Sequence, residues 1–70
     1  MQKFGRKLAI LRKQKGWSQR ELTTVLGYSS HGFIGNLEAG RRKPSLELIT
    51  KIKELFDVSF DQLMDDNVEL

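Results

Sequence analysis

Apolar residues recur every three or four positions along the whole chain, and no segment alternates apolar and polar residues as a half-buried strand does. This spacing predicts an all-α protein. The first stretch, from about Lys3 to Lys15, has three apolar residues on one face, namely Phe4, Leu8 and Leu11. Ile10 lies off that stripe, so we expect it to be exposed, and Gly16 is expected to end the helix.

The second helix has the strongest start signal in the sequence. Ser18 is its predicted N-cap, and Glu21, three residues further on, is the predicted capping-box partner. The preceding residue, Trp17, is placed to pack on Leu22 as a hydrophobic staple. We expect this helix to end at Gly27.

The third helix is predicted to run from about Ser30 to Ala39, and its inward-facing residues are Ile34 and Leu37. Two serines are candidates for its N-cap. With Ser29 in that role, Tyr28 is placed to pack on Phe33, and Ser30 is the other candidate. The sequence does not choose between them.

Two further helices close the chain. The fourth is predicted to begin with Ser45 as its N-cap, and its expected core residues are Leu48, Ile49, Ile52, Leu55 and Phe56. A short fifth helix is expected to begin at Ser59, with Gln62 completing a capping box. The five segments predict one compact five-helix bundle over residues 1–70. Its second and third helices, joined by a turn of about three residues, form a helix-turn-helix unit.

Composition narrows the chemistry by exclusion. The 70 residues include no Cys and one His, so disulfides and the ordinary Cys/His zinc sites are excluded, and we expect no metal and no cofactor. Nothing indicates a nucleophile and a base in a cleft, so no catalytic residue and no enzyme activity are predicted. No apolar run approaches the roughly 20 residues of a membrane span or the roughly 7 of a signal-peptide core, so we expect a soluble cytoplasmic protein.

The net charge of +3 hides an uneven distribution. Residues 1–43 hold ten Lys or Arg and two Glu, a net charge of +8, whereas residues 44–70 hold two Lys and seven Asp or Glu, a net charge of −5. A basic portion beside an acidic one is typical of a protein that turns one side toward a nucleic acid. Three lysines of the first helix are instead interpreted as its solvated polar face: Lys7, Lys13 and Lys15.

The sequence resembles the Cro and phage-repressor type of helix-turn-helix, also called the XRE-like family, in three segments. These are LRKQKGWSQRELTTVLG (Leu11 to Gly27), IGNLEAGRRKPS (Ile34 to Ser45) and LFDVSFDQLM (Leu55 to Met64). The family signature has a Gly, a hydrophobic residue and Ser/Thr-Gln at the second helix, Glu and Gly ending the third, and basic residues with Pro-Ser before the fourth. The matching positions are Gly16, Trp17, Ser18, Gln19, Glu38, Gly40, Arg41, Arg42, Lys43, Pro44 and Ser45.

The resemblance implies a sequence-specific double-stranded DNA-binding domain that inserts its third helix into the major groove. It further implies a transcriptional repressor that acts as a homodimer on a palindromic operator. Apolar residues beyond the needs of the core add limited support for the dimer, namely Ile10, Phe60, Met64 and Val68. An ion pair between Arg12 and Glu38 is also implied. The candidate DNA contacts are Ser18, Gln19, Ser29, Ser30, His31, Gly32, Asn36, Arg41, Arg42 and Lys43.

Physical roles can be assigned to these candidates. Gln19 stands in the first turn of the second helix, where free N–H groups favour a phosphate. His31 and Asn36 can hydrogen-bond to base edges in the major groove. Ser29 and Ser30 can cap the helix and can also reach a phosphate. The basic run of residues 41–43 follows the third helix directly, so phosphate contact is its expected role.

Two features depart from the family pattern. The turn before Ile34 has one residue more than usual, and Gly32 and Gly35 stand where the family places polar or long side chains. One hypothesis is that few side chains read bases directly, so that backbone contacts and DNA shape supply much of the specificity. A second function therefore stays open: a protein-interaction module such as an antitoxin, which these glycines and the acidic final third favour.

Overall fold

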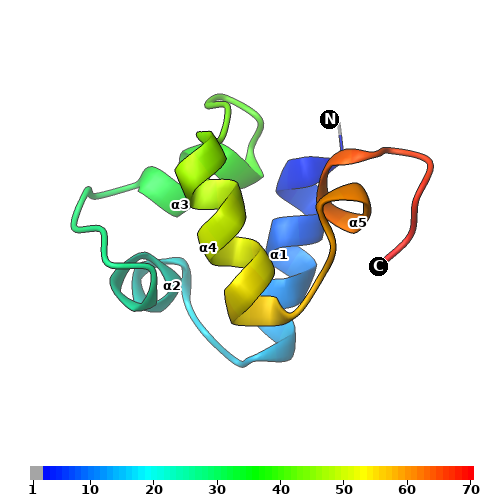
Figure 1. Cartoon of the computed structure of the whole chain (residues 1–70). Coiled ribbons are helices and arrows are strands. Elements are labelled where there is room, and N and C mark those ends of the chain that lie inside the picture. Colours follow the sequence, from blue (N-terminus) through cyan, green and yellow to red (C-terminus); the bar gives the residue numbers. More distant parts are fainter. Residues whose placement is uncertain (1–2) are drawn as a thin grey trace.

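The computed structural model describes residues 3–70, and this part of the chain contains five α-helices and no strand (Figure 1). The helices are α1 (Phe4–Gln14), α2 (Gln19–Val25), α3 (Phe33–Glu38), α4 (Leu46–Phe56) and α5 (Phe60–Met64). The predicted all-α class and five-helix bundle are confirmed. The first two residues of the chain lie outside the described part.

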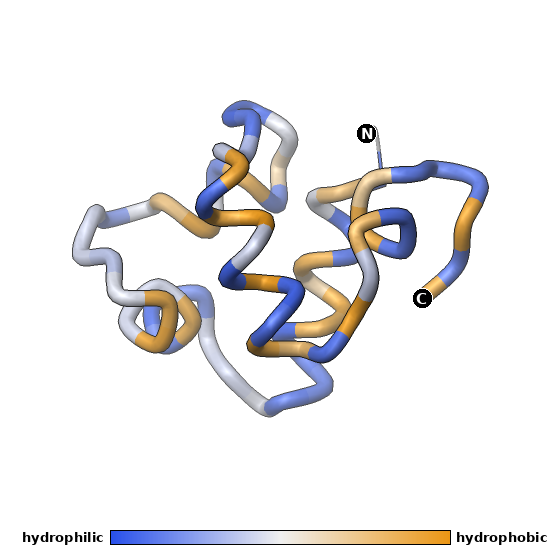
Figure 2. The backbone as a smooth tube through the Cα atoms, viewed as in Figure 1, coloured by the Kyte–Doolittle hydropathy of each residue, from blue (hydrophilic) through white to orange (hydrophobic). Residues whose placement is uncertain are grey.

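The core is formed where the apolar sides of the five helices meet, and its fully buried side chains are Phe4, Leu8, Leu22, Ile34, Leu37, Leu48, Ile52 and Leu63. Apolar and polar positions alternate around α4, as Figure 2 shows, so that one side of the helix is buried. Leu55 and Phe56 were predicted to be core residues but are only partly buried. They lie in the last turn of α4, where Trp17 packs against Phe56 with ring centroids 6.0 Å apart.

Serine caps begin three of the helices as predicted. Ser18 and Glu21 form both hydrogen bonds of a capping box at α2, and Ser59 and Gln62 form the same pair at α5. At α4 the hydroxyl of Ser45 accepts a hydrogen bond from the backbone N–H of Leu48 at 3.1 Å. Each cap satisfies a backbone donor that has no partner within its own helix.

The first helix contains one confirmed expectation and one that was wrong. Ile10 is 41% exposed, as its position off the apolar stripe predicts. Lys7, however, is buried rather than solvated. Its Nζ donates hydrogen bonds to the carbonyl oxygens of Gln62 at 2.6 Å, Asp65 at 2.9 Å and Val68 at 2.6 Å. The end of α5 leaves carbonyl groups without helical partners, and the ammonium group of Lys7 satisfies them from α1.

A close contact between α1 and α3 depends on a glycine. A Cβ atom at Gly5 would overlap the carbonyl oxygens of Leu37 and Glu38 at the end of α3. Only a residue without a side chain therefore lets α1 approach this end of α3 so closely. This contact places Arg12, further along α1, within reach of Glu38.

The start of α3 differs from the prediction. The helix begins at Phe33, and its N-cap is Gly32, which has a left-handed φ of 75° and makes no side-chain cap hydrogen bond. Neither Ser29 nor Ser30 is the N-cap, and Ser30 contributes only its carbonyl oxygen, which accepts from Phe33 N–H at 3.3 Å. The segment between α2 and α3, residues 26–32, is therefore longer than a three-residue turn. The left-handed backbone at Gly32 explains why glycine stands there.

Candidate nucleic-acid interface

A surface hollow lies between α2, the loop of residues 26–32 and the start of α3. It brings together five of the predicted site residues, namely Gln19, Ser29, Ser30, His31 and Gly32. Ser30 and His31 lie in the loop together with Ser29, and not in α3 as predicted, because the helix begins only at Phe33. All five residues are exposed. The polar side chains that immediately precede α3 therefore belong to the α2–α3 loop.

Three further residues on α2 line the same hollow and were missed by the sequence interpretation: Arg20, Thr23 and Thr24. Helical spacing is the signal that could have found them, since residues three and four positions apart are neighbours on a helix surface, as Thr23 is to Gln19 and Thr24 to Arg20. Arg20 and Thr24 are exposed. Thr23 is largely buried, and its hydroxyl donates to the carbonyl oxygen of Gln19 at 2.9 Å.

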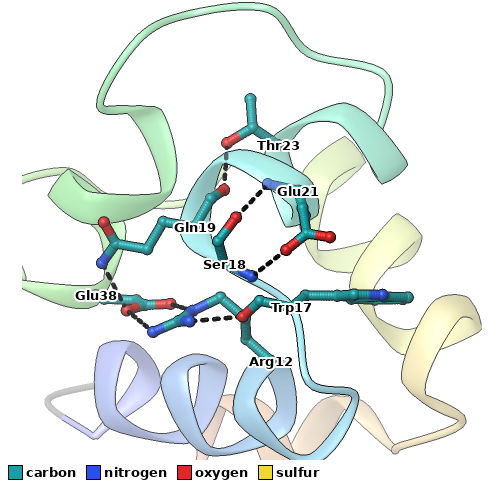
Figure 3. Close-up of polar contacts among 7 residues, drawn as sticks. All are labelled: Arg12, Trp17, Ser18, Gln19, Glu21, Thr23 and Glu38. Carbon is teal, nitrogen blue, oxygen red and sulfur yellow. Dashed lines mark hydrogen bonds and ion pairs between the residues drawn. The ribbon is translucent and has the colours of Figure 1, made fainter.

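A polar network fixes the position of Gln19 (Figure 3). Arg12 and Glu38 form the expected ion pair, with 2.7 Å between Nε and Oε2 and 3.2 Å between Nη2 and Oε1. Arg12 Nη1 also donates to the carbonyl oxygen of Trp17 at 2.8 Å. Gln19 Nε2 donates to Glu38 Oε1 at 2.9 Å. One carboxylate on α3 therefore holds both an arginine of α1 and the first residue of α2.

The same arrangement explains the second unusual glycine. A Cβ atom at Gly35 would lie 3.1 Å from Gln19 Oε1, which is closer than most side-chain contacts. Glycine at this position leaves room for the Gln19 amide between α2 and α3. A side chain at Gly35 would therefore require the Gln19 amide to move by a few tenths of an ångström.

The basic loop after α3 folds back toward that helix. Arg41 Nε donates to Asn36 Oδ1 at 3.0 Å, and the Arg41 backbone N–H donates to the Asn36 carbonyl oxygen at 2.9 Å. The guanidinium carbon of Arg42 lies 5.0 Å from the ring centroid of Phe33. Lys43 is exposed in the same loop. Two of the three predicted phosphate-binding cations are thus held beside α3, and Asn36 is engaged by one of them.

Ser18 has a structural role at the edge of this surface. Its hydroxyl accepts a hydrogen bond from Glu21 N–H at 3.0 Å, and its own N–H donates to Glu21 Oε1 at 2.9 Å. The hydrogen bond from the Ser18 backbone, and to a smaller extent one with its side chain, lowers the pKa of the Glu21 carboxyl below its ordinary value. Ser18 therefore acts as the N-cap of α2.

The described part of the chain has no group of three His, Cys, Asp or Glu residues placed to hold a metal ion. Across residues 3–70, no helix is long and apolar enough to cross a membrane.

Comparison with known proteins identifies the class to which this fold and surface belong. The sequence pattern of a helix-turn-helix family matches residues 8–63, which include α2, α3 and α4 and end within α5. This chain therefore belongs to the helix-turn-helix family, of the XRE type that its motifs resemble.

Three relatives from Bacillus subtilis (strain 168) carry related names. The chain is 38% identical over 58 residues to the HTH-type transcriptional regulator AnsR, covering 83% of this chain and 49% of the relative. It is 36% identical over 61 residues to the SPbeta prophage-derived uncharacterized HTH-type transcriptional regulator YonR, covering 87% and 56%. It is 33% identical over 60 residues to the uncharacterized HTH-type transcriptional regulator YazB, covering 86% of each.

The chain spans about half the length of the first two of these relatives. No solved structure matches it.

Proposed function

We propose that this chain binds double-stranded DNA in a sequence-specific manner and regulates transcription as a repressor, in the cytoplasm and without a cofactor. One observation carries the proposal: exposed polar side chains of α2 and of the α2–α3 loop surround a single hollow, and the basic loop after α3 folds back beside it. A basic surface next to a helix-turn-helix unit is suited to a duplex. The names of the three relatives agree with this function.

In the proposed complex, α3 and the loop before it enter the major groove. Because α3 is only six residues long, contacts to base edges come mainly from Ser30 and His31 in the loop and from Asn36 on the helix. Gln19 and the cations of residues 41–43 contact phosphates on the flanking strands. With few side chains available for bases, sequence-dependent DNA shape supplies part of the specificity.

The decisive experiment is an electrophoretic shift of random duplex at low salt, followed by selection of a preferred site. Arg41→Ala is expected to weaken binding to every sequence and to flatten the slope of log K against log salt by about 0.9. Lys53→Ala, in the acidic half of the chain, is the matched control and should leave the slope unchanged. Absence of any shift by the unmodified chain would refute DNA binding.

We also propose that the chain acts as a homodimer on a palindromic operator, with half-sites about 34 Å apart along the duplex. Of the four apolar residues that the sequence suggested for such a contact, Ile10 is 41% and Phe60 46% exposed, whereas Met64 and Val68 are partly buried. Ile10 and Phe60 lie on α1 and α5, which pack against each other. Footprinting of the selected site should show two protected half-sites, and sedimentation should show a dimer. Protection of a single half-site by a monomer would contradict the dimer.

The repressor assignment has its own test. A reporter gene downstream of the selected site should be expressed less when the chain is supplied, and more if the chain is an activator.

The alternative function, a protein-interaction module, has less support than the sequence suggested. Gly32 has a left-handed backbone and Gly35 makes room for Gln19, so neither glycine requires a protein partner to explain it. The acidic surface of residues 44–70 is the remaining feature in its favour. If the chain causes no electrophoretic shift of any duplex, this alternative becomes the better supported function.

A further inference from the structure

Four side chains from separate segments form one continuous stack beside α3. The rings of Tyr28, in the α2–α3 loop, and Phe33, the first residue of α3, have centroids 4.7 Å apart and planes tilted by 38°. Lys51 Nζ, from α4, lies 4.6 Å from the Tyr28 centroid. The Arg42 guanidinium carbon, from the loop after α3, lies 5.0 Å from the Phe33 centroid. Each ring is therefore paired with a cation from a different segment.

The two ends of the stack differ in how firmly they are held. Phe33 is a core residue with only 7% of its surface exposed, and Tyr28 is partly buried against the same core. Lys51 Nζ also donates to the carbonyl oxygen of Leu26 at 3.3 Å, which fixes its end. Arg42, by contrast, is exposed. The rings and Lys51 are thus the more deeply packed part of the stack, and Arg42 is its exposed end.

Stacking leaves the chemistry of Arg42 intact. A guanidinium group that lies on an aromatic face keeps its N–H donors at the edge of its plane, where they can bind a phosphate or a base. Its neighbour Arg41 is held differently, since its Nε already donates to Asn36 Oδ1. Fixing the Arg42 side chain before DNA arrives reduces the conformational entropy lost on binding.

We propose that Phe33 is a positioning residue for DNA binding, whose ring holds Arg42 ready to contact the duplex beside the α2–α3 loop. This inference rests on the proposed DNA-binding function. It assigns Phe33 a role beyond that of a core residue. The prediction that separates the two roles is energetic coupling: loss of the ring should matter for binding only while Arg42 is present.

A double-mutant cycle tests this coupling on the duplex selected for the unmodified chain. Phe33→Leu, which keeps an apolar side chain, should weaken binding about two- to five-fold, the range of an exposed cation–π contact. In an Arg42→Gln background, Phe33→Leu should have no measurable further effect. In the matched Arg41→Gln background, it should keep its full effect, because Arg41 does not lie on the ring.

Circular dichroism melts should confirm that every variant is folded at the assay temperature. An equal effect of Phe33→Leu in the two arginine backgrounds would overturn the inference while leaving DNA binding intact. If the unmodified chain binds no duplex, the proposed function fails, and this inference fails with it.

Arg42→Lys provides a second test that leaves the core untouched. Lysine keeps the positive charge but loses the planar guanidinium, whose face lies over the Phe33 ring while its edge carries the N–H donors, so binding should weaken by a similar factor while the salt slope stays unchanged. Arg41→Lys is the control for the loss of a guanidinium group alone. Binding by Arg42→Lys that equals binding by the unmodified chain would overturn the inference, even if Phe33→Leu does not fold.

Discussion

The starts of α2 and α3 are built by different means, although the two helices form one helix-turn-helix unit. At α2, Ser18 and Glu21 satisfy each other's backbone groups within four consecutive residues. At α3, the N-cap is a left-handed Gly32 with no side-chain hydrogen bond. Residues of α1, α2 and the loop after α3 contact this second helix instead, and Lys51 of α4 lies over Tyr28 in the loop before it. A helix of six residues is too short to be stable without such tertiary contacts.

Contacts between residues close in the sequence determine where α2 begins, whereas contacts between distant segments determine where α3 begins. The start of α2 follows from its own sequence, whereas the start of α3 and the loop before it depend on Glu38, on the aromatic stack and on the backbone freedom of Gly32. The candidate DNA-contacting side chains are carried mainly by the second region. Substitutions that remove long-range contacts should therefore affect the candidate interface more than substitutions in the local cap.

The largest expected effect comes from removing the carboxylate that joins three helices. Glu38→Ala leaves Arg12, whose side chain is only 11% exposed, without its charged partner and also removes the acceptor of Gln19. We expect a loss of about 3 kcal/mol in the free energy of unfolding, as for other buried pairs from which one partner is removed. Urea denaturation measures this directly.

Glu47→Ala is the matched control, since its exposed contact with Lys51 is 3.8 Å long. It should change stability by less than about 1 kcal/mol. Equal losses for the two variants would show that the Arg12–Glu38 pair does not hold α3 in place.

The same division explains which parts of the fold could be predicted. The starts of α2, α4 and α5 are visible in the sequence because the cap and its hydrogen-bond partner are three residues apart. The start of α3 is not, because the N-cap Gly32 makes no side-chain hydrogen bond, and the contacts of Phe33 with Tyr28 and Arg42 join different segments of the chain. Burial of Lys7 could not be foreseen either, since its partners are main-chain carbonyls, which any residue supplies.

Prediction of the site had the same limit. The motif placed Gln19 in the first turn of the second helix and the basic loop directly after the third, and the structure brings Ser29, Ser30 and His31 around one hollow with Gln19. The sequence did not reveal that Gln19 bonds to Glu38, that Arg41 bonds to Asn36 or that Arg42 lies on Phe33. These contacts depend on side-chain positions across separate helices, for which periodicity and spacing carry no signal.

A smaller effect is expected at the glycine that begins α3. Gly32→Ala forces an alanine into a left-handed conformation, which costs about 1–2 kcal/mol, and no neighbouring atom would contact the added Cβ. Gly35→Ala is the comparison: the gain of about 1 kcal/mol in helix propensity offsets the displacement of Gln19. Thermal melts should show Gly32→Ala as the less stable variant. The reverse order would contradict the left-handed start of α3.

Alanine substitutions at Ser18 and Ser30 compare a serine that caps a helix with one that does not. Ser18→Ala removes a true N-cap and should cost about 1 kcal/mol of stability. Ser30→Ala removes no cap, so its stability should stay within about 0.5 kcal/mol of the unmodified chain, and its effect should be confined to DNA binding. Urea denaturation together with the shift assay distinguishes these outcomes. A loss of stability at Ser30 as large as that at Ser18 would restore Ser30 as the cap of α3.

The smallest expected effect is a pH dependence confined to the local cap. Hydrogen bonds from Ser18 lower the pKa of Glu21 in the folded state, so its contribution to stability is complete above the ordinary carboxyl pKa. That contribution is lost as the pH falls through the lowered pKa of Glu21, where its carboxylate becomes protonated.

The capping box at α5 uses the neutral side chain of Gln62, so its contribution to stability should not depend on pH in this way. Glu21→Gln should therefore reduce the acid-induced loss of stability, and Gln62→Glu should add to it. Identical slopes of stability against pH for all three proteins would show that neither box is linked to proton binding.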